Sequence, residues 1–563
     1  MDTANKPMYE WEAINWAKTQ RLVFKLQKRI YRASERGDVK AVRRLQRLLT
    51  KSCYAKTVAV RKVTQDNQGK NTPGIDGVSR LRNNQKTNLA KNLMLGNKSQ
   101  PTKRVWIPKP GSSEMRPLGI PTMEERAKQA LLKLALEPEW EAKFEPNSYG
   151  FRPGRSCHDA IAAIYNGIVQ KAKYVLDADI EKCFDRINHE KLLRKLNTTP
   201  TFRRQIRVWL QSGVMDGKAL FPTEEGTPQG GVISPLLANI ALHGIEEMLM
   251  KNFSRRTGET SRKRKPSFVR YADDFVLMDE SLEVVLEAKR LIETWLAEMG
   301  LVLKESKTRI THTFIKYGEN VGFDFLGFNI RQYPCSDKQS GSIGGTQRKR
   351  GHKTLIKPSK KAIKRHLDKI DDLLKRNGAS SQEQVINALN PIIRGWAAYY
   401  STVASSHTFN NMDSILYQKL FAWAKRRNNR GQNNTELVSN YWGVNRGQGW
   451  KFMTPDNKYV LERYRETNIK RHIKIKGERS PYDGDLTYWS NRLSQHPMLR
   501  HVVAKLLKKQ DKKCSECHLI FTSEDIMEVH HIDKNRGNNR LNHLTLVHRH
   551  CHDIIHGRGT VTS

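Results

Sequence analysis

The segment FVRYADDFVLM, residues 268–278, decides how the centre of the chain folds. β-Branched and aromatic residues flank a two-acid tip, and neither arm contains glycine or proline, so the segment predicts a strand, a tight turn and a second strand. The adjacent carboxylates of Asp273 and Asp274 repel each other unless a cation neutralises them. Oxygen ligands on a rigid turn suit Mg²⁺, although a solvated acidic turn is the simpler explanation of this pair taken alone.

A second acidic centre lies at the end of the apolar run VLDADI, residues 175–180. The run predicts a strand whose last carboxylate belongs to Asp179. Two strands that carry carboxylates can hold two metal ions roughly 3.5–4 Å apart, the spacing that phosphoryl transfer uses. Together the two segments indicate a metal-dependent site.

Residues 271–274, YADD, resemble the YxDD box of reverse transcriptases, in the form typical of group II intron-encoded proteins. The resemblance implies a right-hand polymerase that copies RNA into DNA from deoxynucleoside triphosphates. Two Mg²⁺ would be held by Asp179 and Asp273, with Asp274 assisting. One would activate the primer 3′-OH, and both would stabilise charge on the transferred phosphoryl group.

Composition points to a large polyanionic partner. The 563 residues are too many for a single core, so we expect three or more domains. Lys and Arg total 99 against 57 Asp and Glu, a net charge of +42, which favours salt-sensitive binding to nucleic acid. No apolar run reaches transmembrane length and no signal peptide opens the chain, so we expect no membrane partner. The seven cysteines form no disulfide framework and indicate a reducing compartment.

Two Gly- and Pro-containing regions are expected to face a nucleotide. Residues 104–111 and 116–122 predict two fingers strands joined by a turn, with Lys109 and Arg116 directed at an anion. The loop 226–235, GTPQGGVISP, enters a helix, and its glycines allow a ligand to approach the backbone. Both regions match boxes of the resembled family.

The resemblance assigns further roles around the nucleotide. Phe184 follows Asp179 by five positions and would lie under the sugar, excluding a ribose 2′-OH; a core phenylalanine is the alternative. Gln229 would lie beside the template–nucleotide pair. Lys307 would lie near the leaving pyrophosphate, with a surface lysine as the alternative. The implied nucleotide-binding residues are Lys109, Arg116, Ile180, Phe184, Gln229 and Lys307.

The N-terminal region predicts two helices broken at Gly37-Asp38. Their opposite faces carry many cations, which fits an RNA-facing surface as well as a solvated helix pair. Loop 71–77 and the box 147–156, NSYGFRPGRS, match the resembled family, and a helix is expected over about 123–144. The apolar positions of the helix pair are Leu22, Leu26, Ile30 and Ala33, then Val42, Leu45 and Leu49.

Beyond the acidic hairpin, we expect an amphipathic helix over 282–299 and an apolar strand at 322–328 that closes the palm. Residues 336–353 predict a linker. Two helices follow, one stopped by Gly378 and one running to Asn390-Pro391. They resemble the thumb, or X (maturase) domain, whose signature matches PIIRGWAAYY at 391–400.

Residues from about 430 to 505 are basic and aromatic and carry no catalytic pattern. The resemblance implies that this region binds DNA. Stacking of aromatic side chains and contacts to phosphate would be the mechanism.

Two cysteine-containing pairs lie near the C-terminus. CxxC at 514–517 and HRHC at 548–551 supply four ligands on two knuckles, a set that suits a closed structural Zn²⁺ site. The ligands would be Cys514, Cys517, His548 and Cys551. His548 is the one ligand of the four that is not a cysteine, which leaves the fourth ligand open.

A histidine cluster surrounds the zinc pairs. His552 and His556 are four residues apart on a short helix, so their imidazoles face the same way. Three neutral imidazoles can hold one divalent cation, and a fourth can deprotonate water near neutral pH. The alternative is a group of ordinary surface histidines.

The histidine pattern resembles an HNH (ββα-metal) endonuclease. The resemblance implies that His530, His552 and His556 hold a divalent metal, Mg²⁺ being expected. His531 would be the general base, and Asn542 would orient the loop that carries it. His543 stands where leucine is common in the resembled family, a harmless departure.

The order of motifs predicts an α+β multidomain group II intron-encoded protein with a right-hand polymerase, a helical thumb, a basic DNA-binding region and a C-terminal ββα-metal domain. We expect extension, fingers and palm over 1–335, thumb over 336–428, DNA-binding region over 429–508 and nuclease over 509–563. The protein would act as monomer or dimer on its intron RNA, assist splicing, nick double-stranded DNA and copy RNA from the nick, in the bacterial cytoplasm and on the nucleoid.

Two other functions stay open at this stage. One is a splicing factor with an inert polymerase, against which the intact acids argue. The other is a homing-type nuclease with an RNA-binding body, against which the complete 226–235 box argues.

Overall fold

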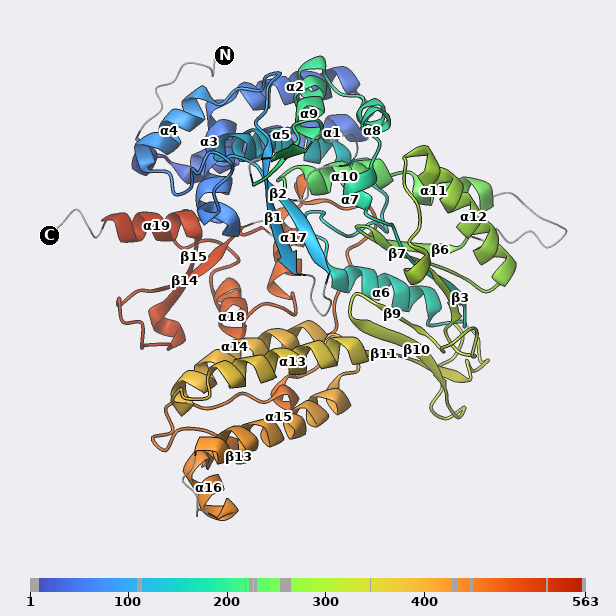
Figure 1. Cartoon of the computed structure of the whole chain (residues 1–563), viewed down its shortest axis with the longest axis vertical. Helices are drawn as coiled ribbons and strands as arrows, with labels where there is room; N and C mark the ends of the chain where they lie inside the picture. Colours follow the sequence, from blue (N-terminus) through green and yellow to red (C-terminus); the bar gives the residue numbers. More distant parts are fainter. Residues whose placement is uncertain are drawn as a thin grey trace.

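The structure is a computed structural model, and it describes residues 10–108, 114–217, 219–221, 226, 230–253, 265–344, 346–427, 433–445, 449–522 and 525–558. N-terminal helices lie beside a polymerase-like body with two sheets, three long helices lie below, and the C-terminal segment returns to the N-terminal helices (Figure 1). Among the described residues, no helix is both long and apolar enough to cross a bilayer.

The N-terminal layer consists of α1 (Trp16–Glu35), α2 (Val39–Lys51), α3 (Cys53–Arg61) and α4 (Asn83–Asn92), packed on α5 (Met123–Glu141). The predicted break at Gly37-Asp38 is confirmed, since Asp38 caps α2 through a 2.9 Å bond from the Ala41 N–H. The predicted apolar face of α2 is buried.

The predicted face of α1 is partly wrong. Leu22 and Leu26 are only half-buried, and the stripe that faces the core is centred on Val23, Gln27 and Ile30. Gln27 can be buried because its amide donates to the Leu134 carbonyl of α5 at 3.1 Å. A buried polar residue hid the true face from the hydrophobic pattern.

The fingers sheet has the strand order β2-β1-β4-β5. As expected, β1 (Thr102–Pro108) pairs antiparallel with β2 (Met115–Ile120). β4 (Val214–Asp216) pairs parallel with β1 and antiparallel with β5 (Ala219–Phe221). Five short helices connect the fingers to the palm: α7 (Cys183–Arg186), α8 (His189–Leu196), α9 (Pro200–Leu210), α10 (Ser234–Leu242) and α11 (Ile245–Phe253).

The palm sheet is antiparallel, with the order β6-β7-β3-β8. Its strands are β3 (Tyr174–Asp179), β6 (Ser267–Tyr271), β7 (Asp274–Asp279) and β8 (Arg309–His312). One face packs against α12 (Leu282–Glu298), with Leu176 and Leu277 in that core, and the other against α6 (Cys157–Ile168), with Val175 and Val276. The sequence of a strand that is covered on both faces is a continuous apolar run, as it is for residues 275–278.

The prediction of a single strand at 322–328 is wrong. Residues there form β9 (Phe323–Phe325) and the start of β10 (Phe328–Pro334), joined by a turn with φ of +50° at Leu326 and +83° at Gly327. Two consecutive residues with left-handed backbone angles end a strand, and glycine adopts such angles easily. β9, β10 and β11 (His352–Pro358) make a separate sheet, so the linker predicted to Lys353 ends at Gly351.

The thumb contains α13 (Lys360–Arg376), α14 (Gln382–Tyr400) and α15 (Ser406–Arg427). The predicted end of the second helix at Asn390-Pro391 is wrong, because α14 continues through Pro391. Burial of Ile393, Ala397 and Tyr400 holds the later turns against the core and outweighs the lost backbone hydrogen bond. The signature at 391–400 is therefore the second half of one helix.

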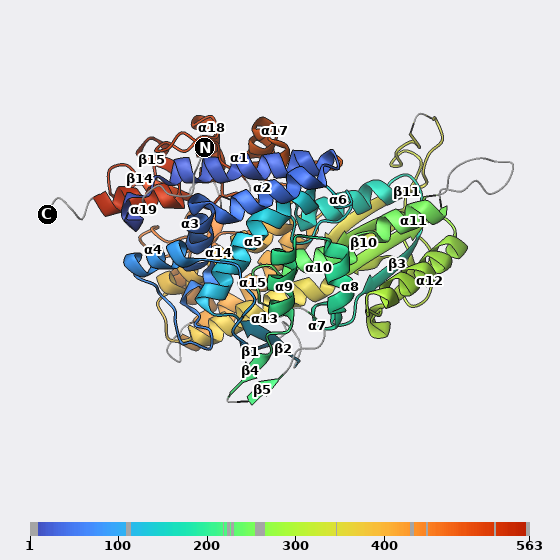
Figure 2. The same ribbon diagram turned by 90° about the horizontal axis from the view of Figure 1, so that it is seen from above.

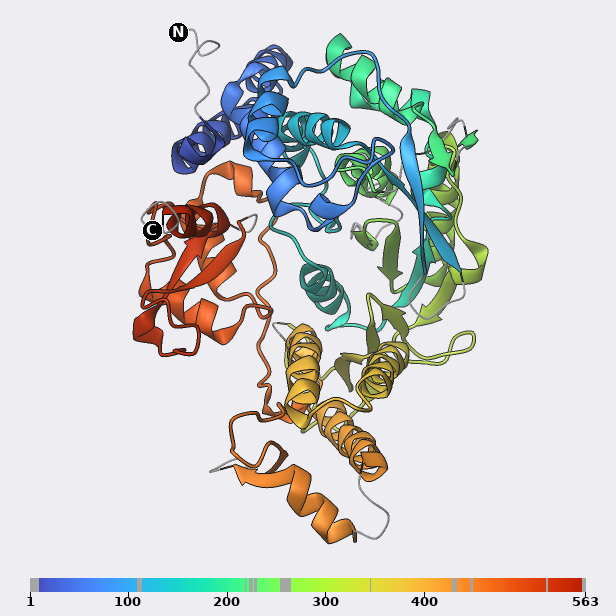
Figure 3. The ribbon, with the colours of Figure 1, turned by 60° about the vertical axis from the view of Figure 1, so that its left-hand side comes forward.

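After the thumb, α16 (Asn434–Tyr441) and a hairpin of β12 (Trp442–Asn445) and β13 (Gly449–Phe452) precede a long irregular strap, residues 453–485. The strap runs back from the thumb to the palm and the N-terminal helices, as Figure 3 shows. The fully buried carboxylate of Asp159 in α6 holds the strap by accepting the Ile475 N–H at 2.8 Å. The same carboxylate accepts from the guanidinium of Arg492, which lies after the strap, at 2.7 Å. The side chains of the strap that remain exposed include Ile469, Lys470, Arg471, Ile473 and Lys476.

Beyond the strap lie α17 (Leu486–Ser494) and what we call the C-terminal metal module, the described residues from His501 onward. It contains α18 (His501–Lys509), the antiparallel pair β14 (Met527–His531) and β15 (Leu544–His548), and α19 (Arg549–Arg558). The module has its own small core, built from Val503, Leu506, Leu507, Phe521, Leu544, Leu546 and Val547. Seen from above, the N-terminal helices and α19 lie toward one end of the molecule, and α11 and α12 lie toward the other (Figure 2).

Candidate active site and metal centres

Three carboxylates meet at one end of the palm sheet. Asp179, the last residue of β3, stands directly opposite Asp274 in the β3–β7 ladder. The turn between β6 and β7 consists of Ala272, with φ +58°, and Asp273, whose carbonyl accepts the Ile180 N–H at 3.2 Å. Residues about 95 positions apart in sequence are therefore held together by main-chain pairing.

The acidic end of the sheet is electrostatically crowded. Burial, followed by repulsion from Asp273 and Asp179, raises the pKa of Asp274 to about 7. Burial also raises the pKa of Asp273, and the nearby charge of Asp179 adds to it. Carboxylates that lack water and repel each other are stabilised by a bound cation, so this end fits Mg²⁺.

Lys307 supplies one fixed positive charge. It lies in the short turn Glu305–Lys307, and its ammonium group contacts the carboxylate of Asp179. About half of the lysine side chain remains exposed. The residue therefore lies at the acidic site, where a phosphate could also reach it, rather than on a remote surface.

Arg270, which sequence reasoning missed, lies under the acidic turn. Its guanidinium is fully buried and donates to the carbonyl of Ala272 at 3.1 Å and to the Asn239 side-chain oxygen at 3.0 Å. Asn239 in turn donates to the carbonyl of Gly150 at 2.8 Å. A Cβ on Gly150 would lie 2.3 Å from the Ala272 nitrogen, so only glycine fits there. The 147–156 box thus supports the turn.

Asp177, also missed, shares a strand face with Asp179. Burial raises its pKa to about 7, and the charges of Asp274 and Asp324 add to the shift. The alternation DAD at 177–179 was the available signal, since residues two apart on a strand face the same way.

The proposed nucleotide residues surround this end of the sheet. Phe184 is half-buried at the start of α7 and meets Phe151 edge to face, with ring centroids 6.2 Å apart. A Cβ on Gly226 would lie 2.5 Å from the Phe184 carbonyl oxygen, so Gly226 lies directly against α7.

Two further positions complete the described set. Arg116 is exposed on β2, and its positive charge offsets a small part of the rise that burial causes in the pKa of Asp273. Ile180 is buried directly after Asp179. Lys109 and Gln229 lie outside the described residues.

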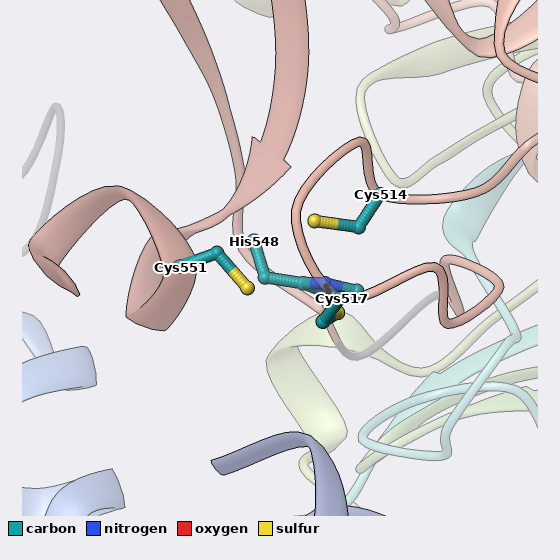
Figure 4. Close-up of side chains that lie close together, drawn as sticks. All are labelled: Cys514, Cys517, His548 and Cys551. Atoms are coloured by element: carbon teal, nitrogen blue, oxygen red, sulfur yellow. Dashed lines mark hydrogen bonds between the residues drawn. The ribbon is translucent and has the colours of Figure 1, made fainter. Parts of the chain in front are cut away.

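Figure 4 shows the first C-terminal cluster: Cys514 and Cys517 from one knuckle, His548 from the end of β15 and Cys551 from α19. Their ligand atoms all lie within 4.8 Å of one another. His548 presents Nδ1 to the Cys517 sulfur at 3.4 Å, while its Nε2 lies 3.5 Å from the Asp525 carboxylate. Three thiols and an imidazole converging on one point, with a carboxylate behind the imidazole, fit Zn²⁺.

The second cluster joins His530 of β14 to His552 and His556 of α19, again with ligand atoms within 4.8 Å. The Glu528 carboxylate lies 2.9 Å from His552 Nδ1, and the other ring nitrogen of His552 faces His556 Nε2 at 3.2 Å. Burial and the neighbouring imidazoles lower the pKa of His530, which favours the neutral form that binds metal.

The side chains of His531 and Asn542 have different environments. The Nε2 atom of His531 is buried and has no hydrogen-bond partner among the described residues. Asn542 is exposed in the turn before β15, and no hydrogen bond to His531 is found within the part of the chain that the structure describes. The loop between the strands is instead closed by the Ile532 N–H donating to the His543 carbonyl at 2.9 Å.

Family descriptions match three stretches of the chain. They are the N-terminal domain of reverse transcriptase over residues 11–93, reverse transcriptase (RNA-dependent DNA polymerase) over 107–330, and the group II intron maturase-specific domain over 363–442. These matches cover the N-terminal layer, the two polymerase sheets and most of the thumb.

Curated relatives extend the likeness. Protein YkfC of Escherichia coli (strain K12) is 32% identical over 325 residues, which cover 51% of this chain and 83% of the relative. The group II intron-encoded protein LtrA of Lactococcus lactis subsp. cremoris is 27% identical over 522 residues, which cover 77% of this chain and 80% of the relative. An uncharacterized 91 kDa protein in the cob intron of Schizosaccharomyces pombe is 26% identical over 511 residues. With the acidic palm turn and the thumb in place, the chain belongs to the family of group II intron-encoded proteins, the reverse transcriptases that carry a maturase domain.

Proposed function

We propose that this reverse transcriptase and maturase also carries its own DNA-nicking endonuclease, and that the nick supplies the primer for copying the intron RNA. The observation that carries the proposal is the C-terminal metal module. It combines a ββα hairpin and helix, a three-histidine cluster and a Cys₃His cluster on a unit that has a small core of its own. A structural metal next to an open histidine site suits a nuclease.

In the polymerase, Asp179 and Asp273 hold Mg²⁺ and Asp274 assists. When bound, two such ions activate the primer 3′-OH and neutralise the charge that develops on phosphate. The chain's own cations, Lys109, Arg116 and Lys307, bind the triphosphate and its leaving group. The charges of Arg116 and Lys307 near buried carboxylates support their part in this assignment.

The remaining nucleotide residues set specificity. Phe184 lies beneath the sugar and excludes a 2′-OH, Ile180 borders the nucleotide through its backbone next to Asp179, and Gln229 lies beside the base pair being formed. The close approach of Gly226 to α7 supports a single pocket made by the two loops.

In the C-terminal metal module, His530, His552 and His556 hold a divalent metal, with Mg²⁺ as the expected ion. His531 deprotonates the attacking water through its Nε2, which has no partner among the described residues and must be uncovered for this step. Asn542 orients the loop, and Cys514, Cys517, His548 and Cys551 hold Zn²⁺ that keeps the knuckles folded.

The proposed domains follow the chain: fingers and palm with the N-terminal extension over 1–335, thumb over 336–428, DNA-binding region over 429–508 and nuclease over 509–563. The net charge of +42 supports binding to intron RNA and duplex DNA. The exposed Lys470, Arg471 and Lys476 of the strap are suited to phosphate. We place the ribonucleoprotein, with a monomer or dimer of the protein, in the bacterial cytoplasm and on the nucleoid.

The test is a nicking assay with the ribonucleoprotein and an end-labelled duplex that contains the insertion site of the intron. Wild type should cut one strand and leave a 3′-OH, and His531→Ala should lower the rate at least a hundredfold with zinc retained. His518→Asn is the matched control, because His518 is exposed in the same module and asparagine tolerates its φ of +56°. Equal nicking by His531→Ala and wild type, or no nicking by wild type, would refute the nuclease assignment.

A further inference from the structure

The C-terminal metal module has a core of its own and meets the polymerase body at few points. Its core residues are separate from the two large cores of the chain. One side chain of α19, Ile554, packs against the core of the N-terminal helices, whereas its neighbour Ile555 packs inside the module. The module therefore resembles a docked unit rather than a continuation of the palm.

The main polar contact at this junction is made by Arg61 of α3. Its guanidinium donates from Nη2 to the Asp553 carboxylate of α19 at 3.0 Å, across 492 positions of sequence. It also lies 4.6 Å from the Trp16 ring of α1 and 3.6 Å from the Asp66 carboxylate. Only 4% of Arg61 is exposed, so its direction is fixed by what surrounds it.

The position of Asp553 on α19 links this contact to the histidine cluster. Asp553 directly follows His552 and precedes His556 by three positions. Residues four apart on a helix share a face, while adjacent residues point about 100° apart. The same short helix thus turns two imidazoles toward β14 and one carboxylate toward Arg61 of α3. Figure 1 shows α19 between β14 and α3.

The apolar part of the junction is incompletely filled. A cavity of about 340 Å³ lies between the N-terminal helices, with Trp16 and Phe24, and the module, with Leu519 and Ile526. The Nε2 atom of His550 lines it without a partner among the described residues. Since a cavity removes packing energy, the ion pair has a larger share in holding the module.

If the module were released, the buried guanidinium of Arg61 would still have partners. Asp66 and Trp16 both belong to the N-terminal region, so they would continue to partner Arg61 if α19 moved away. The Asp553 side chain, which is already 48% exposed, would then become fully hydrated. Breaking the contact therefore avoids the large penalty of an unpaired buried charge.

We propose that Arg61 is a positioning residue for the C-terminal metal module: it orients α19 through Asp553 and thereby fixes the histidine cluster relative to the polymerase body. The contact acts as a releasable latch between the N-terminal helices and the module. Its consequence for DNA cleavage rests on the proposed function, while the docking itself does not.

The docking is tested by photocross-linking in the full-length protein. Gln20 lines the cavity, and its side chain lies 3.5 Å from His550 Nδ1. Gln20→benzoylphenylalanine places a photoreactive group there, and the cavity offers it room. Irradiation should link it to peptides from 544–558, and Asp553→Asn in that background should lower the yield at least threefold. Asp511→Asn, an exposed acid of the same module, is the matched control and should leave the yield unchanged. High salt should weaken the wild-type cross-link, because the pair is partly exposed.

The functional arm uses the same substitutions without the photoreactive group. Asp553→Asn should slow nicking at the insertion site at least threefold or spread the cuts over neighbouring positions. Extension of a pre-annealed primer and zinc content should stay at wild-type values. Arg61→Lys should recover part of the yield and rate lost in Arg61→Gln, since it keeps the charge.

The outcomes separate the two claims. Equal cross-linking of wild type and Asp553→Asn overturns the latch, whatever the nicking result. Reduced cross-linking with unchanged nicking rate and position overturns the positioning role. Absence of nicking by wild type refutes the proposed function, and the cross-linking arm still decides whether Arg61 holds the module.

Discussion

The buried guanidinium of Arg270 donates a 3.1 Å hydrogen bond to the carbonyl of Ala272, the residue that precedes the first acid of the palm turn. Ala272 has a φ of +58°, a conformation that alanine rarely adopts. The contact holds this turn from below, while Asn239 links the guanidinium to the Gly150 carbonyl. Arg270 thus determines where Asp273 stands.

From this relationship we expect Arg270→Lys to raise the Mg²⁺ concentration for half-maximal primer extension by about threefold to tenfold. Both bonds come from the Nη1 atom of Arg270. Lysine keeps the charge, but its shorter side chain does not bring a nitrogen to that place. Titration of Mg²⁺ at saturating nucleotide measures the shift, and Arg290→Lys, an exposed arginine of α12, is the control. An unchanged Mg²⁺ requirement in a folded Arg270→Lys protein would show that the arginine does not position the turn.

Asp273→Asn should abolish cDNA synthesis while leaving intron binding and assisted splicing near wild type. The carboxylate serves metal chemistry, whereas RNA affinity is spread over many cations. Primer extension and filter binding of the intron RNA give the two readouts. Asp337→Asn, in the loop after β10, should change neither. Parallel loss of RNA binding would contradict separate sites.

Phe184→Ala should admit ribonucleotides. The Phe184 ring contacts the Phe151 ring, and Gly226 lies against the Phe184 backbone. We place the sugar of the nucleotide there. Single-nucleotide incorporation should show ribo/deoxy discrimination reduced at least tenfold, with thermal stability changed little because the ring is half-buried. Unchanged discrimination would return Phe184 to the role of a packing residue.

The thumb should lose stability on mild acidification. Burial, aided by Lys369, lowers the pKa of His366 to about 4, and the imidazole stacks on Trp396 and bonds to the Tyr464 hydroxyl at 2.6 Å. Between pH 6.5 and about 4 the unfolded chain binds a proton that the folded thumb does not, so stability present above pH 6.5 is lost as pH falls. The loss is on the order of 3 kcal/mol, at about 1.4 kcal/mol per pKa unit.

His366→Phe tests this dependence. The variant should be less stable than wild type at pH 7.5, because the bond to Tyr464 is lost, yet should lose less on going to pH 5. Thermal denaturation at the two pH values gives both numbers. An equal loss in the two proteins would assign the acid sensitivity to other groups.

The palm could be predicted from the sequence because its signals are local. Strand-forming residues surround Asp273 and Asp274, and the run that ends at Asp179 has the length of a strand. The two C-terminal clusters were also readable, since CxxC, HxxC and an i, i+4 pair set geometry within a few residues.

Features that depend on distant partners were not readable. Arg270 looks like any strand cation until Asn239 and Gly150 are brought beneath the turn. Pro391 obeys its local rule as a helix breaker, and only the packing of the following turn reverses the result. Arg61 and Asp553 leave no local trace of their contact.

The central claim is that the nick made by the C-terminal metal module becomes the primer for the palm, and cDNA synthesis on intact and pre-nicked duplexes tests it most directly. Wild-type ribonucleoprotein should synthesise cDNA on both targets. His531→Ala should fall to background on the intact duplex and return to near wild-type synthesis on the pre-nicked one, because its palm acids are untouched. If the pre-nicked duplex fails to rescue synthesis by His531→Ala, or if that variant copies from intact duplex as well as wild type does, the nick is not the primer and the account is contradicted.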